Sequence, residues 1–239
     1  MLARLFMIIC FLCSINVCGA QVNKDCLSSE KHDSVTYLLV DRSDELKDTQ
    51  NLRQSLAVAK GMITAGERLI VGVSTGKASE TRVLMDYVKP KKSLWVSKLK
   101  IRAAQKRFDD CFNKVAKQIE VQNESHKSSA LLETLGVVSK ALKSDSSKTK
   151  RVIMFSDMVQ NSSAISFYKS PVVNTAKTIK KVESEFLMSS FKGVEFHVAG
   201  VGTGTSDKKA RSIEQFWAKF IETAGGDLRF YGPVLFASS

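Results

Sequence analysis

The amino-acid sequence predicts an α/β protein, with a doubly wound, mostly parallel β-sheet covered by helices on both faces. Short apolar, β-branched runs, which are typical of buried strands, alternate with longer segments of helical periodicity. Parallel strands need such crossover segments between them. The composition is that of an ordinary globular domain, because 44% of the 239 residues are hydrophobic and 25% are charged. We expect a single domain without internal repeats.

The first half of the chain is predicted to supply three strands and two helices. Residues 34–40, S-V-T-Y-L-L-V, form a continuous apolar run, as expected for a strand buried on both faces. Residues 45–63 have helical spacing and an acidic start, which suits a helix N-terminus. Residues 69–74 and 81–88 are predicted strands. A long helix with an apolar stripe is predicted at 93–121.

The second half repeats this alternation and ends in a strand. The predicted helices are 129–142, 175–189 and 208–224, and the predicted strands are 151–155, 194–201 and 228–231. In doubly wound sheets, ligands bind outside the carboxyl ends of the strands, where the strand order reverses. Functional residues are therefore expected in the loops that follow the strands.

The first twenty residues have the pattern of a secretory signal peptide. A basic start and a short apolar run are followed by small residues that suit cleavage after Ala20. An uncleaved membrane anchor is the alternative. The predicted organisation is a signal peptide at 1–20, a tail at 21–33, the domain at 34–233 and a C-terminal tail at 234–239. We expect a periplasmic or secreted protein with no transmembrane segment after cleavage.

Cleavage would leave two of the five cysteines in the chain. Cys10, Cys13 and Cys18 would be removed, whereas Cys26 and Cys111 would remain. In an oxidising compartment these two can form one disulfide. Such a bridge would close a loop of about 86 residues and stabilise the protein by ~4 to 5 kcal/mol in the chain-entropy model. Two buried thiols are the alternative, since the pairing depends on geometry.

A dense group of oxygen donors follows the first predicted strand. Asp41, Ser43, Asp44 and Glu45 lie within one short loop, and Asp157 follows the fourth predicted strand. Parallel strands can bring these two loops together at one edge of the sheet. Divalent cations such as Mg²⁺ bind carboxylate and hydroxyl oxygens, with water completing the coordination. Alternatively, Asp44 and Glu45 cap the first helix.

The same segments resemble a von Willebrand factor type A domain, in particular its secreted bacterial members. The resemblance covers roughly residues 35–231. It is carried by D-R-S-D-E at 41–45, S-S-A-L-L-E-T-L at 128–135, R-V-I-M-F-S-D-M-V-Q-N-S at 151–162 and F-W-A-K-F at 216–220.

The resemblance implies a Rossmann-like fold with a metal-ion-dependent adhesion site that holds Mg²⁺, Mn²⁺ or Ca²⁺. Asp41 and Ser43 match the first and third residues of the family's D-x-S-x-S motif. Ser129 matches the hydroxyl of a second loop, and Asp157 matches the acid of a third. Glu45 stands where the motif has Ser. The added carboxylate can strengthen metal binding while it weakens the capture of an acidic ligand.

The net charge of +12 is unevenly distributed along the chain. Residues 88–108 contain six Lys, two Arg and no acid. This stretch could contact an anionic surface such as lipid headgroups or acidic polysaccharide, or it could be a solvated helix face. Nucleic acid is not expected as the partner of an exported protein. The predicted contacts are Lys91, Lys92, Lys98 and Lys100, together with Arg42, which would steer an acidic group of a protein partner.

One motif indicates a competing enzymatic function. Residues 72–76, G-V-S-T-G, match the G-x-S-x-G motif of serine hydrolases, and Ser74, Asp157 and His197 follow in the order Ser, Asp, His. His197, however, lies within an alternating strand pattern, where a histidine is more often structural than catalytic.

The sequence therefore favours a non-enzymatic, exported module that binds a protein through a divalent metal at the edge of its sheet. A metal-independent scaffold or subunit of a bacterial envelope assembly is the first alternative. A serine hydrolase that uses Ser74 is the second.

Overall fold

The computed structural model describes residues 26–27, 30–43, 49–121, 128–168, 171–202 and 206–236. This part of the chain contains six strands and five α-helices. The strands are β1 (Ser34–Asp41), β2 (Arg68–Ser74), β3 (Arg82–Val88), β4 (Thr149–Phe155), β5 (Val194–Ala199) and β6 (Asp227–Tyr231). The helices are α1 (Thr49–Met62), α2 (Lys98–Val121), α3 (Leu131–Ser144), α4 (Thr175–Ser184) and α5 (Asp207–Thr223).

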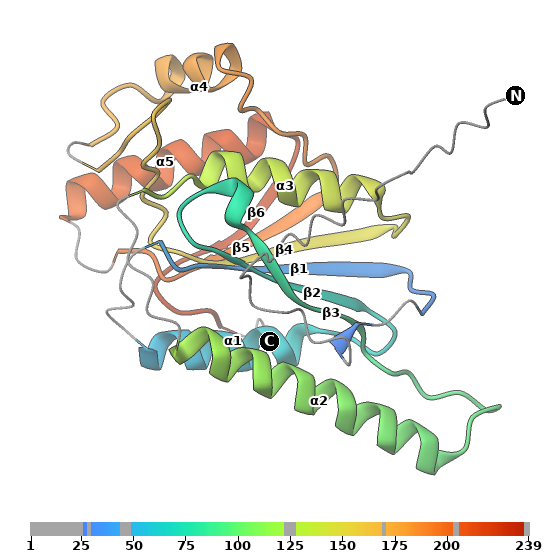
Figure 1. The fold of residues 1–239 in the computed structure, drawn as a ribbon. Helices are drawn as coiled ribbons and strands as arrows, with labels where there is room; N and C mark the ends of the chain where they lie inside the picture. Colours follow the sequence, from blue (N-terminus) through green and yellow to red (C-terminus); the bar gives the residue numbers. More distant parts are fainter. Residues whose placement is uncertain are drawn as a thin grey trace, which may run out of the picture.

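The strands form one sheet in the order β3-β2-β1-β4-β5-β6. All neighbouring strands are parallel except β2 and β3. Helices α1 and α2 lie on one side of the sheet, and α3, α4 and α5 lie on the other (Figure 1). The prediction of a Rossmann-like, doubly wound and mostly parallel sheet with helices on both faces is confirmed.

Strand β3 is the exception to the parallel pairing. Its connection to β2 contains only a three-residue 3-10 helix, Ala78–Glu80. So short a segment cannot cross over the sheet, whereas it can close a hairpin-like turn. The chain therefore reverses direction, and Val88 at the end of β3 pairs with Arg68 at the start of β2.

Two predicted helices differ from the structure by five residues at one end, and the bounds of α3 and α5 differ by one or two residues. Helix α2 begins at Lys98 and not at residue 93, so that residues 89–97 form a loop. Helix α4 ends at Ser184 and not at residue 189. Just after it, Phe186 has a φ of 55°, which is a left-handed conformation that ends the α-helical path. The predicted start of the first helix, at residues 45–48, lies outside the described residues.

The hydrophobic core is divided by the sheet into two clusters. Along β1, Tyr37 and Leu39 face the cluster that contains α3, α4 and α5. Leu38 and Val40 face the cluster that contains α1 and α2. Side chains of a strand alternate between its two faces, and here both faces are buried. This explains why the sequence of β1 is continuously apolar.

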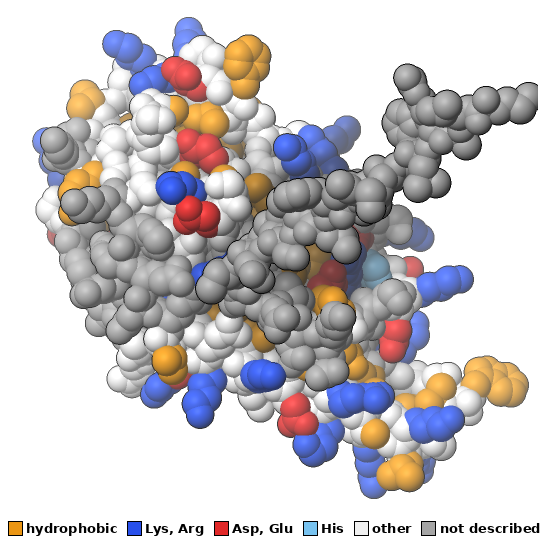
Figure 2. Space-filling model, viewed as in Figure 1, with side chains coloured by type: hydrophobic (Ala, Val, Ile, Leu, Met, Phe, Trp, Pro, Cys, Tyr) orange, Lys and Arg blue, Asp and Glu red, His pale blue; other side chains and the backbone are white. Residues whose placement is uncertain are grey.

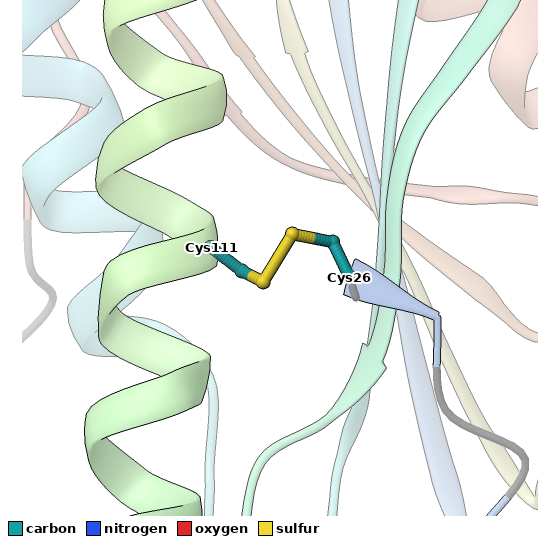
Figure 3. Close-up of a disulfide and its surroundings, with 2 residues drawn as sticks. All are labelled: Cys26 and Cys111. Atoms are coloured by element: carbon teal, nitrogen blue, oxygen red, sulfur yellow. A yellow bond between two sulfur atoms is a disulfide. The ribbon is translucent and has the colours of Figure 1, made fainter. Parts of the chain in front are cut away.

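The N-terminal segment is fastened to the side of the sheet that α2 covers. Cys26 forms a disulfide with Cys111 of α2, with a Cα–Cα distance of 5.6 Å (Figure 3). Leu27 forms a β-bridge with Asp86 of β3, on the outer edge of the sheet. A covered edge is protected from pairing with other chains.

The described part of the C-terminal tail also packs on the domain. Leu235 is fully buried, and its backbone N–H donates to Ser55 Oγ at 3.2 Å. Among the described residues, no helix is both long enough and apolar enough to cross a lipid bilayer.

Candidate functional site

The candidate site lies where the strand order of the sheet reverses. From β1 the chain continues to β2 on one side, whereas β4 on the other side continues to β5. The loops after β1 and β4 therefore diverge, which leaves room at the carboxyl edge between them. Val40 pairs with Phe155, so the residues that follow them, Asp41 and Ser156, come side by side.

Three serines surround the carboxylate of Asp41. Its Oδ2 atom accepts hydrogen bonds from Ser156 Oγ at 2.9 Å and from Ser129 Oγ at 3.2 Å. Its Oδ1 atom accepts the backbone N–H of Ser43 at 3.0 Å. All four residues are buried. The structure thus brings together three of the residues proposed from the sequence, Asp41, Ser43 and Ser129.

Ser129 reaches this cluster from a segment far away in the sequence. Its backbone N–H donates to Asn161 O at 2.9 Å, and the N–H of Asn161 donates back to Ser129 O at 2.7 Å. This bridge fixes the segment before α3 against the segment after β4. The neighbouring Ala130 N–H donates to Gly76 O at 2.9 Å, so the loop after β2 holds it as well.

Burial dominates the electrostatics of the cluster. It raises the pKa of Asp41, and the hydrogen bonds from Ser43, Ser156 and Ser129 offset only part of this effect. Removing a carboxylate from water disfavours its charged form, whereas a nearby cation favours it. A cation at this position would therefore stabilise the ionised Asp41.

Asp157 lies on the same loop as Ser156 and faces a neighbouring pocket. Its Oδ1 atom accepts the backbone N–H of Val159 at 2.9 Å. Together with Glu214 and Tyr231 it lines a pocket of about 450 Å³ at the N-terminal end of α5. Burial, followed by the charges of Glu214 and Asp157, raises the pKa of Tyr231 above its ordinary range.

The donors suit a hard cation only in part. Hydroxyl and carboxylate oxygens are the ligands that Mg²⁺ prefers, with water in the remaining positions. Within the described ranges, however, no three side chains of His, Cys, Asp or Glu come together as metal ligands. A cation here would depend on Asp41, on the serine hydroxyls, on Asp157 and on water. The other two candidates, Asp44 and Glu45, lie outside the described residues.

Arg42 does not occupy the position that its predicted role requires. Arg42 is 1% exposed, and its backbone N–H donates to Ser74 O at the end of β2 at 2.7 Å. A buried guanidinium is not positioned to steer an acidic group of a partner from the surface, which argues against the role predicted for Arg42.

The serine hydrolase alternative is not supported by the geometry. Ser74 is buried, and its Oγ shares a hydrogen bond with Thr134 Oγ1 at 3.2 Å. His197 lies on β5, three strands from β2, which corresponds to about 14 Å at the usual strand spacing. A catalytic base must lie within hydrogen-bond reach of its nucleophile. Ser74, Asp157 and His197 therefore do not form a triad.

The basic residues proposed from the sequence lie at the opposite edge of the sheet. Lys91 and Lys92 belong to the loop after β3, and Lys98 and Lys100 belong to the first turn of α2. All four are exposed. Figure 2 shows basic and hydrophobic side chains together at this end of the molecule. Because β3 ends beside the start of β2, these lysines are far from Asp41.

Two features of the structure were missed in the sequence. Ser156 joins the Asp41 cluster, and the Ser-Asp pair directly after a buried strand was the available indication. The second feature is the exposure of Leu94 and Trp95. Their position within the basic stretch, for which the sequence leaves both an anionic contact surface and a solvated helix face open, was the available indication.

Comparison with known proteins gives partial likenesses among solved structures. No family model matches the chain, and no curated protein matches it. The chain is similar to the conserved hypothetical protein BatB from Bacteroides thetaiotaomicron, with a TM-score of 0.44 and 10% identity, over 84% of this chain and 91% of that one. It is also similar to an aerotolerance-related membrane protein from Bacteroides fragilis, with a TM-score of 0.42 and 10% identity, over 85% and 92% of the two chains.

A third likeness is to the pilus adhesin SpaC from Lactobacillus rhamnosus GG. The TM-score is 0.47 and the identity 10%, and the match covers 86% of this chain but 29% of the adhesin. All three TM-scores and identities are low, and the function is therefore inferred from the site itself.

Proposed function

We propose that this protein is an exported, non-enzymatic, protein-binding module of the von Willebrand factor A type. It engages an acidic group of its partner through a divalent cation at the carboxyl edge of the sheet. The observation that carries the proposal is the convergence of Ser43, Ser129 and Ser156 on Asp41. This convergence lies at the point where ligands bind in doubly wound sheets.

The serine hydroxyls are arranged so that they can serve Asp41 and a cation together. A hydroxyl that donates its proton to a carboxylate keeps its oxygen lone pairs. Ser129 and Ser156 can therefore hold Asp41 in place while their oxygens face a cation. Ser156 Oγ also accepts the backbone N–H of Met158 at 2.9 Å, so it would offer the cation its one remaining lone pair. Asp157, on the same loop, would contribute a second carboxylate directly or through water. A bound cation would supply an open coordination position for a carboxylate of the partner.

The disulfide supports the proposal that the protein is exported. Disulfides persist in oxidising compartments and are rare in reducing ones. The Cys26–Cys111 bridge therefore agrees with the signal peptide that we infer from residues 1–20.

A metal-independent scaffold is the second candidate, and one observation favours it. The two Asp41 oxygens already accept three hydrogen bonds from within the chain, so the buried carboxylate is satisfied without a cation. In that case the cluster would only join the loops after β1 and β4, and contact with a partner would use another surface.

Thermal unfolding separates the two candidates. The chain from Gln21 onward would be unfolded in EDTA and then in Mg²⁺, Mn²⁺ or Ca²⁺. A cation at about a hundred times its dissociation constant stabilises the folded state by ~2.7 kcal/mol. For a domain of this size that corresponds to a rise in Tm of about 5 to 10 °C.

Three variants test where the cation binds. Asp41→Asn and Asp157→Asn should lose the rise in Tm. Asp110→Asn removes an exposed carboxylate that pairs with Lys106 on α2, and it should keep the rise. Asp157→Asn is informative even if the buried Asp41→Asn variant folds poorly. No rise in the wild type would favour the scaffold, and a rise that both site variants retain would place the cation elsewhere.

A further inference from the structure

A basic, partly apolar segment projects from the body of the protein. We call residues 89–102 the basic projection. It consists of the loop after β3 and the first turn of α2. The first buried residue of α2 is Phe108, so the helix extends for more than two turns beyond its contact with the core. Figure 1 shows this end of α2 reaching past the edge of the sheet.

The tip of the basic projection carries large apolar side chains in full contact with solvent. Leu94 is 100% exposed and Trp95 is 95% exposed, and Leu99 in the first turn of α2 is 78% exposed. Single exposed apolar residues are common on protein surfaces and need no explanation. Several of them together at the end of a projection indicate an interaction site.

Positive charge surrounds this apolar tip on both sides. Lys91 and Lys92 precede it and Lys98 and Lys100 follow it, with no acidic residue between 88 and 108. Among the residues that the structure describes, no ion pair involves these four lysines. Their charges are therefore available to an external anionic surface.

We propose that the basic projection binds the surface of a membrane that contains anionic lipids. Leu94 and Trp95 insert among the headgroups, and the flanking lysines contact lipid phosphates. Trp is favoured at the boundary between headgroups and acyl chains, where its ring is half in each environment. Lysines near an anionic leaflet add electrostatic attraction, and the two contributions together give stable binding where either alone is weak.

The combination of features favours a membrane over other anionic partners. A soluble polyanion such as heparin would neutralise the lysines, but it would leave Leu94 and Trp95 in water. A membrane surface supplies phosphates and an apolar layer at adjoining depths, so it is complementary to both kinds of side chain. The inference uses a different edge of the sheet from the candidate cation site and does not depend on it.

Tryptophan fluorescence gives a local test. The chain has two tryptophans; Trp217 is 0% exposed and Trp95 is 95% exposed. A blue shift on adding vesicles, with protection from acrylamide quenching, would therefore report on Trp95. The chain from Gln21 onward holds every described element of the fold and lacks the apolar N-terminal run. We expect the shift with vesicles of equal parts phosphatidylglycerol and phosphatidylcholine, and its loss in Trp95→Phe.

Paired variants test the apolar tip and the charges separately. Leu94→Ser/Trp95→Ser should weaken vesicle binding at least tenfold, because it removes the inserted apolar surface. Its control is Phe186→Ser, which removes an apolar side chain that is 95% exposed elsewhere and should leave binding unchanged.

For the charges, Lys98→Gln/Lys100→Gln should bind about 30-fold more weakly, because each lysine near an anionic surface contributes about a factor of five. Its control is Lys177→Gln/Lys180→Gln on α4, where both lysines are also exposed; this variant should bind as the wild type does. Gln and Lys have similar helix propensities, so neither double variant should change the unfolding temperature.

Three results would overturn the proposal. The first is vesicle binding that the Leu94→Ser/Trp95→Ser variant retains in full. The second is equal binding to vesicles of phosphatidylcholine alone, which would exclude recognition of anionic lipid. The third is binding to heparin together with no spectral shift on any vesicle, which would identify a polyanion surface. None of these results bears on the cation experiment.

Discussion

Loss of the Cys26–Cys111 disulfide should lower the free energy of unfolding by about 4 to 5 kcal/mol. The two cysteines are 85 residues apart in the sequence, and the loop between them contains β1, α1, β2 and β3. In the chain-entropy model, closing a loop of this length removes about 15 cal/mol/K from the unfolded chain, which is about 4.6 kcal/mol at 25 °C. Domains are typically stable by about 5 to 15 kcal/mol, so the bridge should account for much of the stability.

Urea denaturation of the chain from Gln21 onward measures this effect. The unfolding midpoint of the oxidised protein is compared with that of the same protein in excess reductant and with that of the double variant Cys26→Ala/Cys111→Ala. Cys26 is fully buried and Cys111 nearly so, so reduction is best completed in urea and followed by refolding. The reduced chain should also have a larger slope m, because its unfolded state exposes more surface.

The double variant is the control: reductant should leave its unfolding midpoint unchanged, since that variant has no disulfide to break. A loss of less than 1 kcal/mol on reduction of the wild type would refute the reasoning. It would mean that the N-terminal segment is held to the domain equally well by its other contacts, such as the bridge between Leu27 and Asp86 of β3.

Two further predictions concern residues that hold segments to the domain. Burial lowers the pKa of His32, but hydrogen bonds to a backbone carbonyl and to Asp145 outweigh it and raise that pKa above its ordinary value. The stabilisation of the fold by His32 should therefore be complete below about pH 6.5 and be lost as the pH rises through the raised pKa. Urea denaturation at a series of pH values should show this dependence in the wild type and not in His32→Gln. Trp217 is fully buried, and its Nε1 donates to Met158 O at 2.8 Å. Trp217→Phe should cost about 2 to 3 kcal/mol in the same assay, because it leaves a cavity and removes one of the two hydrogen bonds that Met158 O accepts, the other coming from the N–H of Gln160. Trp95→Phe at the exposed tip should cost almost nothing.

The fold was predictable because the burial of each strand leaves a mark in the sequence. Residues 34–40 are apolar on both alternating sets of side chains, and the structure places one set in each core cluster. The direction of β3 was not predicted, although the strand itself was. Periodicity identifies a strand without its direction, and the short connection after Ser74 was the better indication.

The candidate site was predictable to the extent that it depends on strand ends. Asp41 and Ser156 meet because their strands are parallel neighbours in register. The burial of Arg42 was not predictable, since an arginine in a loop after a strand is normally exposed. Its backbone N–H donates to Ser74 O at the end of β2, which continues the pairing of β1 with β2, and no pattern in the sequence shows that the side chain after this bond is buried.

The reversed direction of β3 also determines how the two proposed surfaces are related. If β3 were parallel to β2, the basic projection would begin at the carboxyl edge, beside Asp41. Instead β3 ends next to Arg68 at the start of β2, so the projection begins at the amino edge. The neighbouring β1 has eight residues, and at about 3.3 Å per residue its ends are about 25 Å apart. A membrane that holds Leu94 and Trp95 at the amino edge would therefore leave Asp41 and its serines at the opposite, carboxyl edge of the sheet, open to a protein partner.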